Sequence, residues 1–161
     1  MKRFARPGLL WALLLILPLA VAGCQREPEA KNPPPADLAA VLLEGLEFDD
    51  QLESIDQDAA LTVLGLENWQ DKLEGCSVYM GSGATPEQIV VLQAADEDSA
   101  RQIAQSLKES YLKQLKDSFA DYAPAALPKI EDAQLEARGR TAVLCVCPKG
   151  AAAKTILDKE L

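Results

Sequence analysis

Seven residues near the C-terminal end, Thr141 to Cys147 (TAVLCVC), are apolar at almost every position. Side chains of a β-strand point alternately to its two faces, so a strand of this composition has apolar residues on both faces. Such a strand belongs in the interior of a sheet rather than at its edge. The sequence therefore predicts a sheet in which residues 140–147 form a central strand.

Three further strands are predicted from short apolar runs that are bounded by glycine, proline or charged residues. They cover residues 74–80 (EGCSVYM), 88–95 (QIVVLQAA) and 133–138 (AQLEAR). Arg138-Gly139-Arg140 forms the turn into the central strand. Because short connections between consecutive strands favour antiparallel pairing, we expect a roughly four-stranded antiparallel sheet.

Apolar residues recur at spacings of three and four between Asp96 and Ala120, which predicts one long amphipathic helix. A loop with Pro124 and Pro128 follows this helix. Pro148-Lys149-Gly150 then begins a final helix. The long helix presents one apolar stripe, which predicts that it packs on the sheet.

Two shorter helices are predicted ahead of the first strand, at residues 37–46 and 57–64, with Asp37 and Asp56 as their N-caps. After them the order of elements is strand-strand-helix-strand-strand-helix. The sequence therefore predicts a single α+β domain over residues 37–161. We expect this domain to have two layers, with the helices on one face of the sheet.

The N-terminal residues have the three parts of a secretory signal. Lys2, Arg3 and Arg6 are basic, residues 9–19 (LLWALLLILPL) are apolar, and small residues lead to Cys24 in the stretch Val-Ala-Gly-Cys. The apolar run falls short of the roughly 20 residues that a spanning helix needs. The Val-Ala-Gly-Cys stretch resembles the lipobox of bacterial lipoproteins. An ordinary cleavage site, or an uncleaved signal anchor with an incidental cysteine, is the alternative.

The lipobox resemblance implies that the thiol of Cys24 accepts a diacylglycerol group and that removal of residues 1–23 leaves Cys24 as the first residue. Two acyl chains hold a protein on a membrane far more firmly than one. Residues 24–36 (CQREPEAKNPPPA) then form a proline-rich tether of extended geometry. We therefore expect a lipid-anchored, extracytoplasmic protein on the outer face of the cell membrane.

The formal net charge is −9, and loss of the three basic residues of the predicted signal makes the mature chain more acidic still. Nucleic acid is not an expected partner, because its phosphates require clusters of Lys and Arg. The negative charge also opposes spreading on an anionic lipid surface. The lipid on Cys24 is therefore the predicted membrane contact.

Residues 81–87 (GSGATPE) join two predicted strands as a turn or wide hairpin. A glycine-rich loop can present backbone N–H groups to an anion. This loop, however, has no Lys or Arg and lacks the G-x-x-x-x-G-K pattern of phosphate-binding loops. We treat it as a candidate surface for a ligand or partner. The candidate residues are Tyr79, Gly81, Ser82, Gly83, Ala84, Thr85 and Glu87.

Three cysteines other than Cys24 are present, at Cys76, Cys145 and Cys147. Cys145 and Cys147 face the same side of their predicted strand, at a spacing unlike the Cys-x-x-Cys of redox and zinc sites. Either all three are small buried apolar residues, or Cys76 forms a disulfide with one of the pair. No metal site and no cofactor are expected, because the chain has no His and the acidic residues between 49 and 58 lack the pattern of a calcium loop.

Several features carry a resemblance to a known family: residues 79–92 (YMGSGATPEQIVVL), a helix with an acidic start, residues 119–124 (FADYAP), residues 129–133 (KIEDA) and a strand pair around Gly139. From about Asp37 to its end, the chain resembles a family of small lipoproteins of Firmicutes-type bacteria, the domain of unknown function DUF4358. Pro86 and Gln88 depart from the acidic or small residues usual there. The resemblance implies a location and an architecture, and transfers no activity and no site residues.

The expected function is that of a non-catalytic module that binds an envelope protein or a small ligand near the membrane. Without histidine, a Ser-His or Cys-His nucleophile system is excluded. A carboxylate-dependent hydrolase of the cell envelope is one alternative, with Glu87 and Asp121 as its candidate residues. A small accessory subunit of a transporter is another.

Overall fold

Five strands form one antiparallel sheet. The computed structural model describes residues 31–161, and in this range the strand order across the sheet is β1-β2-β3-β5-β4. The strands are β1 (Glu53–Ile55), β2 (Leu73–Met80), β3 (Gln88–Ala94), β4 (Gln134–Arg138) and β5 (Thr141–Val146). The predicted signal peptide, Cys24 and residues 25–30 of the predicted tether lie outside the described residues.

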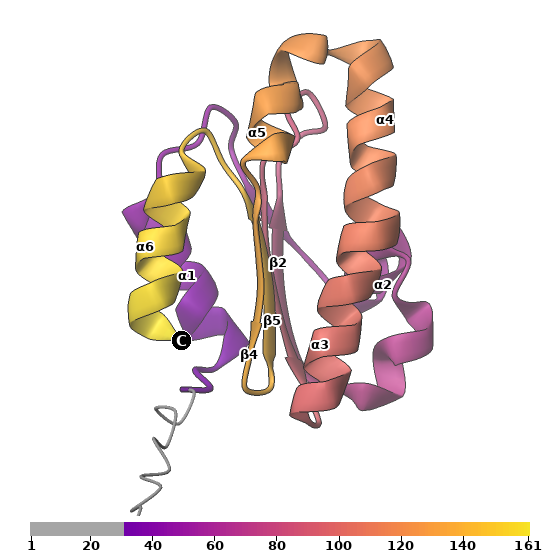
Figure 1. Ribbon diagram of the computed structural model, residues 1–161, viewed down its shortest axis with the longest axis vertical. Helices are drawn as coiled ribbons and strands as arrows, with labels where there is room; N and C mark the ends of the chain where they lie inside the picture. The colour runs from indigo at the N-terminus through magenta and orange to yellow at the C-terminus, as the bar shows by residue number, and fades with distance from the viewer. Residues whose placement is uncertain (1–30) are drawn as a thin grey trace, which may run out of the picture.

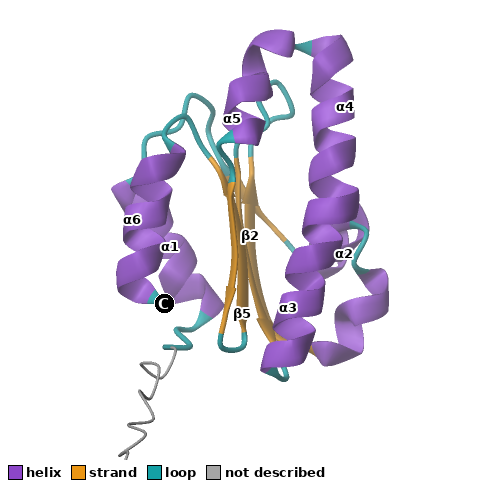
Figure 2. Ribbon diagram, viewed as in Figure 1, coloured by secondary structure: helices purple, strands orange, loops and turns teal. Residues whose placement is uncertain are grey.

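Helices cover both faces of the sheet, as Figures 1 and 2 show. The α-helices are α1 (Pro35–Gly45), α2 (Gln57–Leu64), α3 (Glu97–Ser106), α4 (Leu112–Tyr122), α5 (Leu127–Glu131) and α6 (Gly150–Glu160). The described residues also contain two 3-10 helices, η1 (Glu67–Lys72) and η3 (Pro124–Ala126), and a π-helical turn, η2 (Leu107–Tyr111). The mixed composition and the antiparallel sheet confirm the sequence prediction.

The prediction of two layers, with all helices on one face, is wrong. The domain has three layers, because α1 and α6 cover the face opposite to α2, α3, α4 and α5. The central strands explain this arrangement. Val90 and Leu144 point into one buried cluster, whereas Val91 and Val143 point into the other. Since both faces of β3 and β5 are apolar, both faces need a covering layer, and the first and last helices supply the second one.

The predicted strand count was also wrong, because the short strand β1 pairs with the end of β2 and places Glu53 opposite Met80. The sequence Glu-Ser-Ile has little apolar character, and its register comes from its neighbour. Two local features differ as well. Asp37 lies in the first turn of α1 and makes no cap there, whereas the expected loop around Pro128 forms η3 and α5.

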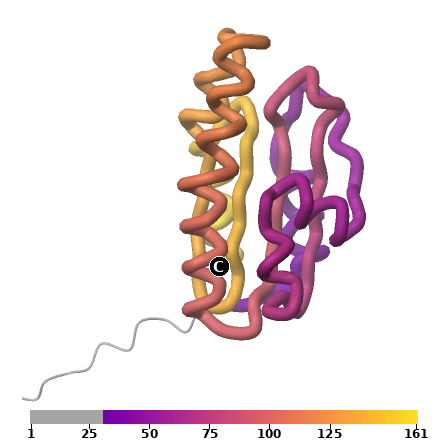
Figure 3. Tube along the Cα trace, turned by 90° about the vertical axis from the view of Figure 1, so that its right-hand side faces the viewer, coloured from indigo at the N-terminus to yellow at the C-terminus, as the bar shows by residue number. Residues whose placement is uncertain are grey.

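The long predicted helix is present as α3 and α4, joined by the π-helical turn η2. Figure 3 shows these segments running as one rod along the domain. Apolar residues Leu107, Tyr111, Leu115 and Phe119 follow one another at steps of four, which exceed the 3.6 residues of an α-helical turn. A π-turn takes up an extra residue, so it keeps this stripe directed at the sheet.

The first described residues and the loop of residues 81–87 lie at opposite ends of the domain. At the end that we call proximal, the Lys31 backbone N–H donates to the Leu161 carbonyl (3.2 Å), and the Arg140 backbone N–H donates to Asn32 Oδ1 (2.7 Å). The first described residues are thus fixed beside the C-terminus and the β4–β5 turn. The loop formed by residues 81–87 lies at the opposite, distal end, next to α5 (Figure 1).

Candidate functional site

The candidate loop, residues 81–87, is the β2–β3 connection, and its shape is fixed by its own backbone. The Gly81 N–H donates to the Glu87 carbonyl at 3.1 Å and closes the loop at its base. Gly83 has φ 89°, a left-handed conformation that favours glycine. Ser82, Gly83 and Ala84 are exposed, so the tip of the loop faces solvent.

The carboxylate of Asp50 occupies this loop. Its Oδ2 accepts hydrogen bonds from the Ser82 N–H (2.8 Å), the Ser82 hydroxyl (2.8 Å) and the Thr85 hydroxyl (3.3 Å). Gly81 allows the close approach, since a Cβ at this position would lie 2.7 Å from Asp50 Oδ2. The anion-binding character considered from sequence is therefore directed at a carboxylate of the chain itself.

Glu87 makes the reciprocal contact. Its side chain is fully buried, and its Oε2 accepts hydrogen bonds from the backbone N–H groups of Asp49 (2.8 Å) and Asp50 (2.9 Å). Asp50 thus holds the β2–β3 loop, while Glu87 holds the backbone of the segment that carries Asp50. Two loops that lie more than thirty residues apart in the chain are locked together.

Lys129 of α5 completes this arrangement by pairing with Glu87 Oε1 (2.5 Å) and Asp49 Oδ2 (2.6 Å). Burial alone would lower the pKa of Lys129, but its hydrogen bonds to Asp49 and Glu87 and their charges outweigh burial and raise it. The ammonium group therefore stays charged. We call the set Asp49, Asp50, Ser82, Thr85, Glu87 and Lys129 the distal clamp.

A small apolar hollow of about 120 Å³ lies beside the distal clamp, between the loop and α4. Its lining includes Met80, Pro86, Gln88, Tyr111, Leu115 and Phe119. The Tyr111 hydroxyl donates to Gln88 Oε1 (2.8 Å), and Gln88 Nε2 donates to the Pro86 carbonyl (3.3 Å). Gln88, one of the two departures from the family pattern, is therefore a buried link between the loop and the long helix.

The remaining predicted residues do not join the distal clamp. Tyr79 lies in β2 and packs against the cluster under α1 and α6. Cys76, Cys145 and Cys147 are free thiols, and Cys76 packs on the opposite face of the sheet from the other two. A disulfide from Cys76 to either of them would have to pass through the sheet.

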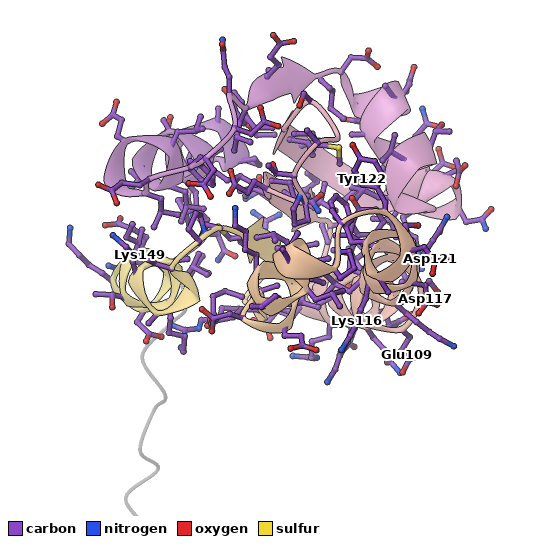
Figure 4. All side chains as sticks on the ribbon, turned by 90° about the horizontal axis from the view of Figure 1, so that it is seen from above. Glu109, Lys116, Asp117, Asp121, Tyr122 and Lys149 are labelled. Carbon is purple, nitrogen blue, oxygen red and sulfur yellow. The ribbon has the colours of Figure 1, made fainter. Side chains whose placement is uncertain are left out.

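The two carboxylates considered for hydrolysis have different surroundings. Glu87 is buried, and both of its oxygens are engaged by Lys129 and by the backbone N–H groups of the clamp. Asp121 is exposed near the end of α4, and Figure 4 shows it at the outer edge of the domain. The described residues contain no group of three or more Cys, Asp or Glu arranged for a metal ion.

Glu87 and the loop were named from the sequence as candidates, whereas Asp50 and Lys129 were not expected to be their partners. The acidic residues between 49 and 58 were considered for calcium binding, whose loop pattern they lack. Asp50 and Lys129 lie 32 and 42 residues from their partners in the loop. A pairing over such distances has no local signature in the sequence. Burial of Glu87 would imply a cationic partner, but it would not say which residue supplies the cation.

Because Asp50 is hydrogen-bonded in the folded protein, part of the free energy of unfolding should depend on pH. Hydrogen bonds from the Ser82 side chain and backbone hold the pKa of Asp50 below its ordinary value of 3.8. A carboxyl group whose pKa is lowered by folding stabilises the fold above that ordinary value, and this contribution is lost as the pH falls through the folded-state pKa. We expect Ser82→Ala to lower the free energy of unfolding at about pH 6 and to have a smaller effect at about pH 3.

Urea unfolding at the two pH values measures this difference. Ser118→Ala, at an exposed position of α4, is the matched control and should have no pH-dependent effect. An equal effect of Ser82→Ala at both pH values would contradict the role assigned to Asp50.

The described residues therefore define an α/β/α domain whose distal end is closed by a clamp of buried and exposed charges. Residues 46–147 match the family model described as a domain of unknown function (DUF4358), and the chain belongs to this family. The match includes all five strands and α2 to α5, whereas α1 and α6 lie outside it. Neither the curated proteins nor the solved structures gave a significant match to the chain. None of the helices in residues 31–161 combines the length and the apolar character needed to cross a bilayer.

Proposed function

We propose that this protein is a lipid-anchored, extracytoplasmic module that binds a protein partner of the cell envelope through its distal end. The observation that carries the proposal is the placement of the two ends. The chain enters the domain at the proximal end, where Lys31 and Asn32 are held, and the exposed loop tip lies at the other end (Figure 2).

The lipobox resemblance at Cys24 supports the anchor, and the prolines that follow it support a spacer. A chain held by lipid at Cys24 would reach the domain at Lys31 and Asn32, so the proximal end would face the membrane. The distal end would then face away from the lipid, where it is accessible to another envelope protein.

The distal clamp supports binding rather than chemistry. Its hydrogen bonds fix the loop backbone, and a loop that is already ordered loses less conformational entropy when it binds. In contrast, a carboxylate that acts as a general acid or base needs a free oxygen within reach of its substrate. Both oxygens of Glu87 are already bonded within the chain.

Site-specific photo-crosslinking of the full-length, membrane-anchored protein in its own cells tests this proposal. One variant carries the photo-reactive residue in place of Ala84 at the loop tip, and its matched control carries it in place of Lys159 near the proximal end. Both positions are exposed. We expect a recurrent protein adduct from position 84 that is absent or several-fold weaker from position 159.

Cys24→Ala in the same background tests the anchor, because it removes the thiol that would accept the lipid, and the protein should then no longer incorporate a labelled fatty acid. A transporter subunit or a wall enzyme as the recurrent adduct would identify the kind of partner. Equal adducts from both positions, or none from position 84, would refute binding through the distal end.

A further inference from the structure

Two free thiols, Cys145 and Cys147, lie together at the end of β5. They are alternate residues of an extended segment, so their side chains point to the same face. Both belong to the cluster beneath α1 and α6. Cys147 follows the last strand residue, Val146, and precedes the first turn of α6. It can therefore move without breaking the pairing of β5 with its neighbours.

Cys147 lines a hollow although its exposed fraction is only 1%. The hollow has a volume of about 230 Å³ and lies between the end of α1 and the start of α6. Gly45, Leu46, Glu47, Lys149 and Ala152 form the rest of its lining. Water occupies about 30 Å³ per molecule in the liquid, so a solute of a few atoms fits this space, whereas a folded protein does not.

The groups around Cys147 favour its thiolate. The thiol of Cys145 acts as a hydrogen-bond donor to Cys147 and lowers its pKa below the ordinary value of 9.0. Burial opposes this effect, the backbone N–H of Lys149 adds to it, and the negative charges of Asp132 and Glu87 oppose it. The pKa of Cys145 is raised in turn, because its proton is held between the two sulfurs.

Two residues that line the hollow form an ion pair, in which Lys149 Nζ lies 2.8 Å from Glu47 Oε2. Figure 4 views the domain from the distal end and shows Lys149 at the start of α6. The start of a helix favours a neighbouring thiolate, because its free N–H groups and its dipole stabilise negative charge. The hollow thus leads from solvent to a thiol in an environment that favours its ionised form.

We propose that Cys147 and Cys145 form a peroxide-reactive thiol pair, in which Cys147 attacks the oxidant and Cys145 resolves the product as a disulfide. This activity goes beyond the proposed binding function and does not depend on it, since it uses a different site. A hydroperoxide small enough to enter the hollow is the substrate class.

The reaction balances with one molecule of hydrogen peroxide. The Cys147 thiolate attacks one peroxide oxygen, the O–O bond breaks, and hydroxide leaves, so that Cys147 becomes a sulfenic acid. The hydroxide takes the proton of the Cys145 thiol and becomes water. The Cys145 thiolate then attacks the sulfur of Cys147, the S–S bond forms, and the second hydroxide leaves and takes up the proton that Cys147 had released to solvent.

Cys76 provides an internal comparison, because burial raises its pKa to about 11 and leaves it as an inert thiol. Trypsin separates the two sites. Cleavage after Arg140 and Lys149 places Cys145 and Cys147 in one peptide, and cleavage after Lys72 and Arg101 places Cys76 in another.

The experiment treats the full-length protein, reduced beforehand, with hydrogen peroxide at about pH 7, blocks the remaining thiols by alkylation, and follows both peptides by mass spectrometry. We expect the peptide of residues 141–149 to lose two hydrogen atoms at least about tenfold faster than Cys76 is oxidised. The same comparison in urea should abolish the difference, because it depends on the fold.

Two variants keep the test independent of a single substitution. Cys145→Ser should prevent the disulfide and leave a sulfenic acid on Cys147 that a carbon nucleophile can trap, and Cys147→Ser should leave Cys145 reduced. Circular dichroism confirms that each variant is folded. The proposal is overturned if Cys147 of the Cys145→Ser protein is oxidised no faster than Cys76, or if the folded protein keeps both thiols of residues 141–149 while Cys76 reacts.

Discussion

Replacement of Glu87 by alanine is expected to lower the free energy of unfolding by about 3–5 kcal/mol, which is the range for removal of one partner of a buried ion pair. The side chain of Glu87 is fully buried, and Lys129 is only 20% exposed. Glu87→Ala leaves Lys129 with Asp49 as its remaining carboxylate partner. It also leaves two backbone N–H groups of the neighbouring loop without their acceptor.

Urea unfolding at about pH 7 measures the effect, and three further variants show which contacts cause it. Asp49→Ala should cost less than about 1 kcal/mol, because its side chain is 66% exposed and its ion pair is screened by solvent. Glu87→Gln should fall between the two, since it keeps one acceptor and loses the charge. Lys129→Met combined with Glu87→Ala should cost less than the sum of the single changes, because it removes the largely buried cation that has lost its buried partner.

A result in which Glu87→Ala destabilises the protein no more than Asp49→Ala would contradict the distal clamp as a source of stability. The same variant bears on the proposed function. If the clamp orders the loop tip, crosslinking from position 84 should weaken in Glu87→Ala under conditions where the protein is still folded.

The central part of the fold could be predicted because its signals are local. The apolar segments of β3 and β5 and the turn at Gly139 define a hairpin-rich antiparallel sheet. Gly139 has φ 52°, as the first central residue of a two-residue hairpin turn of this kind requires. The helix cap at Asp56, whose carboxylate accepts from the Ala59 N–H at 2.9 Å, was also readable from the sequence.

The layer count could not be predicted in the same way. The moderately apolar faces of α1 and α6 fit either side of the sheet, and the chain gives no local sign of which side each helix takes. Both faces of β5 are apolar, which indicates a covering layer on each side of the sheet, but this property belongs to the sheet and does not assign a side to either helix. The strand β1 gives a still weaker signal, because its three residues depend on the edge of β2 for their conformation.

The candidate site shows the same division. From sequence, the glycine-rich loop was considered as a place where backbone N–H groups could face an anion, and the group that approaches Gly81 in the structure is the carboxylate of Asp50. The identity of the approaching group was not predictable, since Asp50 reaches Gly81 only after β1, α2 and η1 have brought the chain back to the sheet. Lys129 in turn reaches Glu87 from a short helix that sequence analysis interpreted as a loop.

Replacement of Gly150 by alanine is expected to cost about 3 kcal/mol, at the upper end of the usual cost of overpacking. Gly150 is buried at the first position of α6, where its N–H donates to Asp132 Oδ2 at 2.8 Å. An added Cβ would lie 2.1 Å from the Asp132 carbonyl oxygen and 2.6 Å from its carboxylate. Either Asp132 or the start of α6 has to move.

Gly45→Ala is the matched control, because its added Cβ would meet only the end of the flexible Ile156 side chain, at 2.7 Å. Alanine also has a higher helix propensity than glycine, so we expect a change of less than about 1 kcal/mol. Urea unfolding of both variants gives the comparison. Equal effects would mean that the contact between Gly150 and Asp132 does not restrict this position.

A combination with Asp132→Ala separates the two contacts of Gly150. If the carboxylate were the obstacle, Asp132→Ala would relieve the strain of Gly150→Ala and the double variant would be more stable than the sum predicts. The carbonyl oxygen lies closer, and no side-chain substitution removes it. We therefore expect little relief, which would assign the requirement for glycine to the approach of two backbones. Because Cys147 precedes this contact by three residues, Gly150→Ala should also shift the start of α6 and slow the oxidation of the thiol pair.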